Sequence, residues 1–476
     1  MGPLEQTMPL LRPNAAPLWL AASALLAAGC PAPDDTAAGD PAQTVVLITV
    51  DALSPRMLWG NDGQWETAPQ LWDFFDQSVV LRNVLTPRGL TAVALTSLST
   101  GTYPRDHGMR INSSQARPRR STLFERFQAA GYHTMGYSAN LCYVMDYGVD
   151  ERVCTWSGEE ESLGGLAERD NQLVNSLLTR LPSLSADDKV FLWLHLNQPH
   201  KPFVAVSEYY DLFHPEPYVG ELNTADVDQT YEVALGTQPF DDADRIHMEA
   251  VYASQVRAVD DNVGRVLDAL DAIDRYEQAV VIFGADHSEE LAEHHNFFYH
   301  GCPPYNDTLG VSFAFRAPER LPRGIQLDTW VSNTDIAPTI ADITEAFTWD
   351  GVPVGRSLAA SMRTEHIQPE PIFLERGVQT AGVIDGWDKY IMSGTEGTDD
   401  CKPYDELGGA YPGELEELYD LESDPGELDN IVEQHSSKRD ELRSEVCAWI
   451  QAEDWVDWDE VSDNLLLQQC DAWTAR

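Results

Sequence analysis

Positive charge is scarce in this chain of 476 residues, in which 31 lysines and arginines stand against 78 aspartates and glutamates and the net charge is −47. Such a strong negative field argues against nucleic acid or an anionic membrane surface as a partner. It also means that an anionic substrate needs a locally positive pocket, which a metal ion and histidines can provide. No internal repeat is found, and the length predicts one large domain with a smaller one.

Long apolar runs are also missing. Residues 18–28 are apolar but too few to span a bilayer as a helix, and they lead into Leu25-Leu-Ala-Ala-Gly-Cys30. This segment resembles a bacterial lipoprotein signal, so we expect residues 1–30 to be a signal peptide with a lipobox and residues 31–43 a flexible tether. The chain is then an exported, periplasmic or cell-surface lipoprotein that reaches the membrane only through a lipid on Cys30. A plain secretory signal is the alternative, and export follows from either.

No Cys-x-x-Cys pair occurs, which argues against a zinc–thiolate site. Without Cys30 the chain has six cysteines, and an even number in an exported protein suggests disulfides, although six cysteines allow 15 pairings. Cys142 with Cys154 is the easiest local pair. The remaining four are Cys302, Cys401, Cys447 and Cys470.

Apolar runs of strand length alternate with helical patterns along the first 365 residues. The expected strands are residues 45–50, 79–84, 133–137, 190–196 and 279–283, and the expected helices are residues 71–75, 122–130, 163–181 and 248–273. This alternation predicts a doubly wound, mostly parallel α/β sheet. Asp51, His195 and Asp286 fall at or just past strand ends, which is where sites lie in such sheets.

The stretch around Thr91 is unusual because Pro87 and Gly89 stop whatever precedes it, and a run of small and hydroxyl residues follows as far as Gly101 and Pro104. This pattern predicts a loop that delivers one hydroxyl to the start of a short buried helix. The free N–H groups and partial positive charge of a helix N-terminus suit an anionic ester oxygen. The alternative is that Thr91 is only the N-cap of a close-packed helix.

The run Thr100-Gly-Thr-Tyr-Pro104 resembles the sulfatase signature of the alkaline phosphatase superfamily, in which the nucleophile lies ten residues before the glycine. Counting back from Gly101 gives Thr91, with Thr96 and Ser97 as fallback nucleophiles. The resemblance extends from Val45 to about Trp449. It implies a catalytic α/β domain over residues 44–365 and, over residues 366–476, an α+β subdomain with a small antiparallel sheet and a closing helix.

The resemblance also implies a metal site. Asp51 opens a segment similar to the family's first metal-binding loop, and Asp286-His287-Ser-Glu resembles its Asp-His-Gly-Glu segment. With Thr91 these residues form a complete shell for one divalent ion, for which calcium, zinc and manganese are the candidates. The alternative is that the aspartates merely cap helices.

Further family positions imply substrate contacts. His195 and His200 lie in a segment that resembles His-x-x-x-Pro-His-x-Pro, and they would bind the ester oxyanion and protonate the leaving group, while His300 would contact the anion. Histidines at strand ends are also commonly structural. Four more residues are candidates for substrate binding: Lys201, His107, Asn112 and Asn140.

The chain departs from aryl sulfatases at the nucleophile. Formylglycine is made from cysteine or serine followed by x-Pro-x-Arg, whereas this chain has Thr91-Ala-Val-Ala-Leu95. Threonine nucleophiles resemble those of nucleotide pyrophosphatases and phosphoethanolamine transferases. We therefore expect a metal-dependent hydrolase of a sulfate or phosphate ester on a small molecule, glycan or lipid. The alternatives are a phosphoryl-group transferase and a non-catalytic surface binding protein.

Overall fold

The computed structural model describes residues 40–112, 117–155, 165–214, 216–220, 222, 227–234, 236–294, 298–301, 304–349, 355–376, 380–394, 415–452 and 465–474. The predicted signal peptide with Cys30, most of the tether, and both Cys302 and Cys401 lie outside these residues. Within them, no helix combines the length and apolarity that crossing a membrane requires.

The larger sheet has nine strands in the described chain, in the order β4-β3-β5-β1-β6-β7-β2-β8, with β9 beside β2. Their bounds are β1 Thr44–Val50, β2 Val79–Leu85, β3 His133–Ser138, β4 Glu151–Cys154, β5 Val190–Leu196, β6 Val280–Ala285, β7 Gly310–Arg316, β8 Ile325–Leu327 and β9 Val331–Ser332. The predicted mostly parallel sheet is confirmed. Strands β4, β7, β8 and β9 were not predicted, and β7 runs antiparallel to both of its neighbours, β6 and β2.

Strands β5, β1 and β6 form the parallel centre of this sheet, and every residue in them is buried. Continuous Val, Ile and Leu runs suit this position because helices cover both faces of such a strand. Val50 is in register with Leu196 on one side and with Ala285 on the other. The three strands therefore end at the same level, and the residues that follow them are neighbours.

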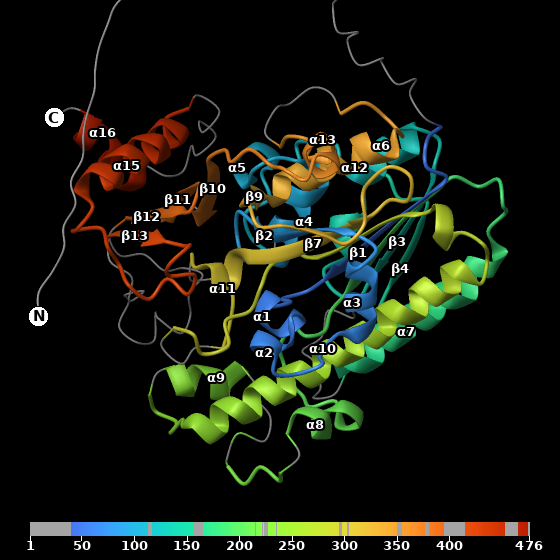
Figure 1. Cartoon of the computed structure of the whole chain (residues 1–476), viewed down its shortest axis with the longest axis horizontal. Helices are drawn as coiled ribbons and strands as arrows, with labels where there is room; N and C mark the ends of the chain where they lie inside the picture. Colours follow the sequence, from blue (N-terminus) through green and yellow to red (C-terminus); the bar gives the residue numbers. More distant parts are fainter. Residues whose placement is uncertain are drawn as a thin grey trace, which may run out of the picture. The chain divides into compact units, whose positions relative to one another are not determined.

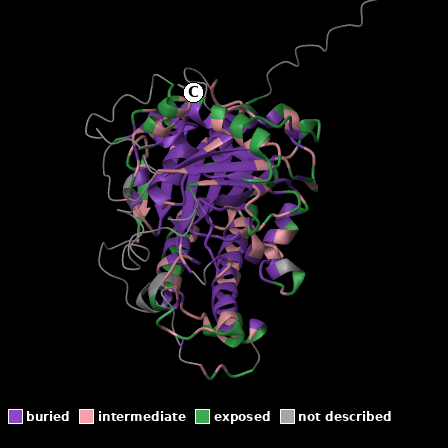
Figure 2. Cartoon of the chain, turned by 90° about the vertical axis from the view of Figure 1, so that its left-hand side faces the viewer, coloured by how far each residue is buried: buried purple, intermediate pink, exposed green. Residues whose placement is uncertain are grey.

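Helices lie on both faces of the sheet, with α3, α7 and α10 on one and α4, α6 and α12 on the other (Figure 1). The sheet between them is buried almost throughout (Figure 2). The helices are α1 Pro55–Leu58, α2 Gly60–Gly63, α3 Pro69–Phe75, α4 Thr91–Thr100, α5 Pro104–His107, α6 Leu123–Ala129, α7 Gly165–Arg180, α8 Ser207–Phe213, α9 Val227–Ala234, α10 Asp242–Asp271, α11 Asn306–Leu309, α12 Ile336–Thr344, α13 Ala359–Arg363, α15 Ser436–Ile450 and α16 Leu465–Thr474.

Helix α4 begins at Thr91, and all ten of its residues are buried, which explains its small side chains. Its N-cap is Leu90, so the reading of Thr91 as a simple N-cap is wrong. The helix ends at Gly101, which has φ of 64°, and a β-carbon there would lie 2.7 Å from the Trp349 ring. Glycine is therefore required at this position of the signature by conformation and by space.

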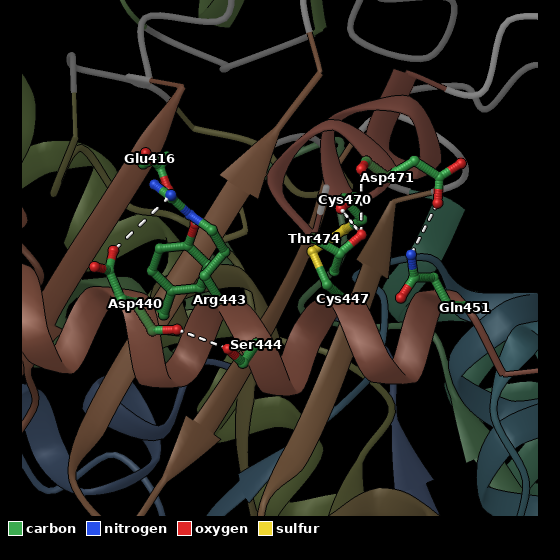
Figure 3. Close-up of a disulfide and its surroundings, with 10 residues drawn as sticks. Glu416, Asp440, Arg443, Ser444, Cys447, Gln451, Cys470, Asp471 and Thr474 are labelled. Carbon is green, nitrogen blue, oxygen red and sulfur yellow. Dashed lines mark hydrogen bonds and ion pairs between the residues drawn. A yellow bond between two sulfur atoms is a disulfide. The ribbon is translucent and has the colours of Figure 1, made fainter. Parts of the chain in front are cut away.

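A second, antiparallel sheet follows in the order β10-β11-β12-β13, with bounds Ile372–Arg376, Thr380–Asp385, Asp388–Ser393 and Glu416–Asp420. Helix α15 packs on β11 and β12, and the Cys447–Cys470 disulfide joins it to α16 (Figure 3). The predicted Cys142–Cys154 disulfide is confirmed. The small C-terminal sheet agrees with the expectation, whereas the domain boundaries at 43/44 and 365/366 stay predictions.

Candidate active site

The site lies at the carboxyl ends of β1 and β6, where Asp51 and Asp286 each follow directly after a strand. The Asp51 N–H donates to the Leu196 carbonyl at 2.9 Å, and the Asp286 N–H donates to the Val50 carbonyl at 3.2 Å. These bonds continue the sheet ladder by one residue. Both carboxylates are held at its edge with no exposed surface.

Asp51, Asp286 and His287 could hold a metal ion, because one ligand atom from each lies within 4.8 Å of the others. His287 Nδ1 donates to the Ser288 carbonyl at 3.0 Å, which leaves the lone pair on Nε2 facing the carboxylates. Asp286 Oδ1 accepts the N–H groups of Ala52 and His287, while its buried Oδ2 has no hydrogen-bond partner among the described residues. Two carboxylates, one of them with an oxygen that accepts no hydrogen bond, and an imidazole are a donor set that fits a divalent cation.

The two carboxylates are electrostatically unlike. Burial and the charge of Asp51 raise the pKa of Asp286 well above its usual range. Burial also disfavours ionised Asp51, but nearby His200, His195 and His287 outweigh it and hold the pKa of Asp51 low. Without a cation, ionising both carboxylates costs electrostatic free energy because the two negative charges repel each other. A bound cation would relieve that repulsion.

The Thr91 hydroxyl faces this group from the start of α4. Its Oγ1 lies 3.4 Å from Asp51 Oδ1 and 3.3 Å from His287 Nε2. The next N–H of the helix, that of Ala92, donates to Asn112 Oδ1 at 3.0 Å. Asn112 therefore lies beside Thr91 as a partner of the helix N-terminus. We call Asp51, Thr91, Asp286 and His287 the rim site.

The fallback nucleophiles point elsewhere. Thr96 Oγ1 donates to the Ala92 carbonyl within the helix at 2.6 Å, and Ser97 Oγ lies 2.9 Å from His107 Nε2. His107 Nδ1 accepts the Met109 N–H at 3.0 Å, so both ring nitrogens of His107 are used within its own neighbourhood. Burial lowers the pKa of His107 to about 3, as expected for a neutral core histidine. The structure does not bring His107 to the rim site.

Three other predicted histidines surround the rim site. The His200 and His300 rings are 4.9 Å apart, and the His300 and His287 rings are 4.4 Å apart. His195 Nε2 lies 3.8 Å from Asp51 Oδ2. Burial lowers the pKa of His200, of His287 and, most strongly, of His300. Neutral imidazoles near neutral pH can bind a cation or carry a proton.

Each ring is oriented by a partner behind it. The Trp193 indole donates to Thr49 Oγ1 at 2.8 Å, so the Thr49 hydroxyl hydrogen is available to His195 Nδ1, 2.9 Å away. His200 Nδ1 donates to the Lys201 carbonyl at 2.6 Å. These contacts direct the Nε2 atoms of both rings away from their partners.

Two weaker candidates also lie here. Asn140, just past the end of β3, donates its amide to Asp51 Oδ2 at 2.6 Å, so it contacts the rim site directly. Lys201 Nζ lies 3.3 Å from the centre of the Tyr299 ring, which in turn stacks on His300 at 4.9 Å. The Lys201 charge is thus held next to a predicted anion contact.

Glu289 is a residue that the sequence reasoning missed. It is fully buried, and its Oε2 lies 3.0 Å from His300 Nδ1. Burial raises the pKa of Glu289 well above its usual range. The spacing Asp286-His287-Ser288-Glu289 was the signal, because it matches the family segment in which only the first two residues were given a role.

The chain is similar to known sulfatases. The family model described as Sulfatase matches residues 43–346. A choline-sulfatase of Rhizobium meliloti is 24% identical over 82% of this chain and 82% of its own length, and an arylsulfatase of Clostridium perfringens is 23% identical over 84% of this chain and 92% of its own.

Solved structures show the same fold. BT4656, in complex with its substrate D-glucosamine-2-N,6-O-disulfate, superposes with a TM-score of 0.70 at 16% identity and covers 89% of this chain and 99% of its own. The phosphonate monoester hydrolase of Agrobacterium radiobacter superposes with a TM-score of 0.66 at 16% identity and covers 86% of this chain and 95% of its own.

Proposed function

This chain belongs to the sulfatase family of the alkaline phosphatase superfamily, and on that premise we propose that it is a metal-dependent hydrolase of a sulfate or phosphorus ester with Thr91 as its nucleophile. The position of Thr91 Oγ1 carries the proposal, because it lies within 3.4 Å of both Asp51 and His287. Relatives that act on choline sulfate, aryl sulfates and phosphonate monoesters support an ester of this class.

Asp51, Asp286, His287 and Thr91 would hold the cation. When bound, a divalent ion supplies positive charge that favours the deprotonated threonine and the charge that develops on the ester oxygens. The imidazole ligand favours manganese or zinc over calcium.

The reaction is a double displacement. The Thr91 oxygen attacks sulfur or phosphorus in line, the bond to the leaving alcohol breaks, and His200 passes the threonine proton to that alcohol. Water then attacks the threonyl ester, giving a proton to the same imidazole, which returns it to Thr91 as the inorganic or monoester anion leaves. His195, His300 and Lys201 contact the anion, and Glu289 orients His300.

Threonine sets this chemistry apart from the formylglycine route. Formylglycine is an aldehyde made at the β-carbon of cysteine or serine, and the β-carbon of threonine carries a methyl group that prevents this product. The covalent intermediate must therefore be released by a second attack at sulfur or phosphorus.

The test combines metal analysis with a panel of sulfate monoesters, phosphate mono- and diesters and phosphonate esters, run on wild type, Thr91→Ala and Thr91→Ser. We expect Thr91→Ala to retain metal but lose at least about 10³-fold in kcat/KM, roughly 4 kcal/mol of barrier. Thr91→Ser should retain part of the activity. Full activity in Thr91→Ala would overturn the assignment.

Mass spectrometry of a quenched reaction separates the remaining alternatives. A sulfuryl or phosphoryl group on the Thr91 peptide supports the intermediate, and a transferase would give mainly transferred product when an acceptor alcohol is added. Metal binding without turnover of any ester would favour the non-catalytic binding protein.

We also propose that the protein is exported and anchored through a lipid on Cys30, as the leader Leu25-Leu-Ala-Ala-Gly-Cys30 indicates. Labelling cells with a radioactive fatty acid should mark the wild type but not Cys30→Ala.

A further inference from the structure

One residue of the C-terminal region contacts both ends of the loop that carries His300. His294 Nε2 donates to the Glu427 backbone carbonyl at 3.3 Å, and the Asn306 N–H donates to Glu427 Oε2 at 2.5 Å. Between these two points the chain passes His300, whose ring faces His287 and His200. Asn306 begins α11 (Figure 1), and the Tyr305 hydroxyl, just before it, donates to Glu417 Oε2 on β13 at 3.1 Å.

A buried lysine completes the contact. Lys389, on β12, has no exposed surface, and its Nζ lies 2.6 Å from Glu427 Oε1 and 2.8 Å from Asn306 Oδ1. Glu427 is only 2% exposed. We call Glu427, Lys389, His294 and Asn306 the Glu427 clamp. It joins the second sheet to the loop between β6 and β7 of the first sheet.

The burial of the Glu427 side chain sets it apart from other glutamates with the same backbone conformation. Glu427 has φ of 53°, in the left-handed region that suits glycine or asparagine better than glutamate. Glu319, Glu345 and Glu365 share this conformation but are not buried. Glu427 is buried against the Lys389 ammonium, and burying this charge is tolerated because its counter-charge is buried with it.

We propose that Glu427, paired with Lys389, is a positioning residue for His300: it fixes both ends of the loop that carries this histidine, so the C-terminal sheet is a working part of the active site. The proposal rests on the proposed function, in which His300 contacts the anion. Asp286 and His287 precede the clamped loop and follow directly after β6, so the clamp acts on the anion contact and leaves the metal ligands in place.

The test uses the full-length protein carrying Glu427→Gln, with Glu416→Gln as the matched control. Glu416 also pairs with a cation, Arg443 on α15, and its strand neighbours that of Lys389 (Figure 3). This pair makes no hydrogen bond or ion pair with the described residues of the loop. We expect Glu427→Gln to lower kcat about 100-fold, because a displacement of about 1 Å at a reacting centre costs that order. The metal content of Glu427→Gln and its Kd for the metal should stay within about 3-fold of wild type. Glu416→Gln should keep the wild-type kcat.

A double-mutant cycle with His300→Ala separates positioning from general destabilisation. If Glu427 acts through His300, Glu427→Gln should lower kcat less than about 3-fold in the His300→Ala background. Full additivity of the two substitutions would overturn the proposal.

Hydrogen–deuterium exchange gives a readout that needs no turnover. Peptides covering residues 298–306 should exchange at least about 10-fold faster in Glu427→Gln than in wild type, and at the wild-type rate in Glu416→Gln. If the wild type turns over no ester, the proposed function fails while this measurement still decides whether the clamp holds the loop.

Two further variants cover the case in which Glu427→Gln does not fold. Lys389→Met/Glu427→Gln removes both charges together, so no unpaired charge stays buried, and Asn306→Ala removes a single contact of Lys389. Faster exchange at residues 298–306 in either variant supports the proposal. Unchanged exchange and unchanged kcat in any folded clamp variant overturns it.

Discussion

The rim site and the Glu427 clamp are both buried groups of ionisable side chains, but only the clamp places a carboxylate against a lysine ammonium. In the clamp, the two carboxylate oxygens of Glu427 meet the Lys389 ammonium and the Asn306 N–H. At the rim site, Asp51 and Asp286 lie around one imidazole, and Asp286 Oδ2 has no hydrogen-bond partner in the described part of the chain.

This difference shows how to distinguish a buried ion pair that stabilises the fold from a group of carboxylates that could bind a cation. Burying charges is tolerated when each finds its opposite, as in the clamp. Two carboxylates that lie close together, as at the rim site, are stabilised when a cation binds between them. The first arrangement supports the fold, and the second is a donor set that could hold a cation.

Asp286→Asn is expected to have the largest effect, and it tests whether the rim site binds a metal. Removing this carboxylate should abolish tight metal binding and lower kcat/KM by at least about 10³-fold, because the ion's stabilisation of the developing charge is lost. Metal titration followed by calorimetry, together with steady-state kinetics, checks both effects.

The same variant tests the sign of the stability effect. In metal-free protein, Asp286→Asn should raise the free energy of unfolding by about 1.4 kcal/mol or more, the equivalent of one pKa unit of like-charge repulsion. Chelation should lower the Tm of wild type but not that of Asp286→Asn. If the metal-free variant were less stable than wild type, the Asp286 carboxylate would stabilise the fold without a cation, as Glu427 is expected to do in the clamp.

Glu427→Gln should have the opposite effect on stability. It leaves the Lys389 ammonium buried without its counter-charge, so we expect a loss of about 3 to 5 kcal/mol in urea unfolding. The paired change Lys389→Met/Glu427→Gln should recover most of this loss. Equal losses in the single and paired variants would show that the ion pair is not what holds the two sheets together here.

The Cys447–Cys470 disulfide separates general stabilisation of the C-terminal region from positioning of His300. It stabilises that region from a place away from the His300 loop. It closes a loop with a sequence separation of 23 (Figure 3). Replacing both cysteines with serine should cost about 3 kcal/mol. Assays at a temperature where the variant is folded should give wild-type kcat, whereas a drop like that of Glu427→Gln would assign the positioning effect to the whole region.

A pH-dependent effect concerns His107, a buried histidine away from the rim site. Burial lowers its pKa to about 3, so the folded protein keeps it neutral while the unfolded chain protonates it below about pH 6.5. Its contribution to stability is present above pH 6.5 and is lost as pH falls, by about 1.4 kcal/mol per pH unit. Wild type should lose about 2 kcal/mol between pH 7 and pH 5 that His107→Gln does not lose, as measured by urea unfolding.

The fold was predictable where signals are local. Val45-Val-Leu-Ile-Thr-Val50 and residues 190–196 are runs that only a buried parallel strand accommodates, and both are strands. Strand β7 was missed although Val311-Ser-Phe-Ala-Phe315 alternates large and small residues, and its antiparallel direction depends on its neighbours. Local patterns do not say which strands pair.

The sequence alone determined the positions of Asp51 and Asp286 after buried strands and the start of a helix at Thr91, because each depends on residues within one turn or one strand. Only the tertiary structure decided that His107 bonds to Ser97, that Asn140 reaches Asp51, that Glu289 holds His300, and that Glu427 holds the ends of its loop. Those contacts join residues up to 133 positions apart. Such pairs are brought together by the packing of the whole chain. They therefore produce no pattern in the sequence around either residue.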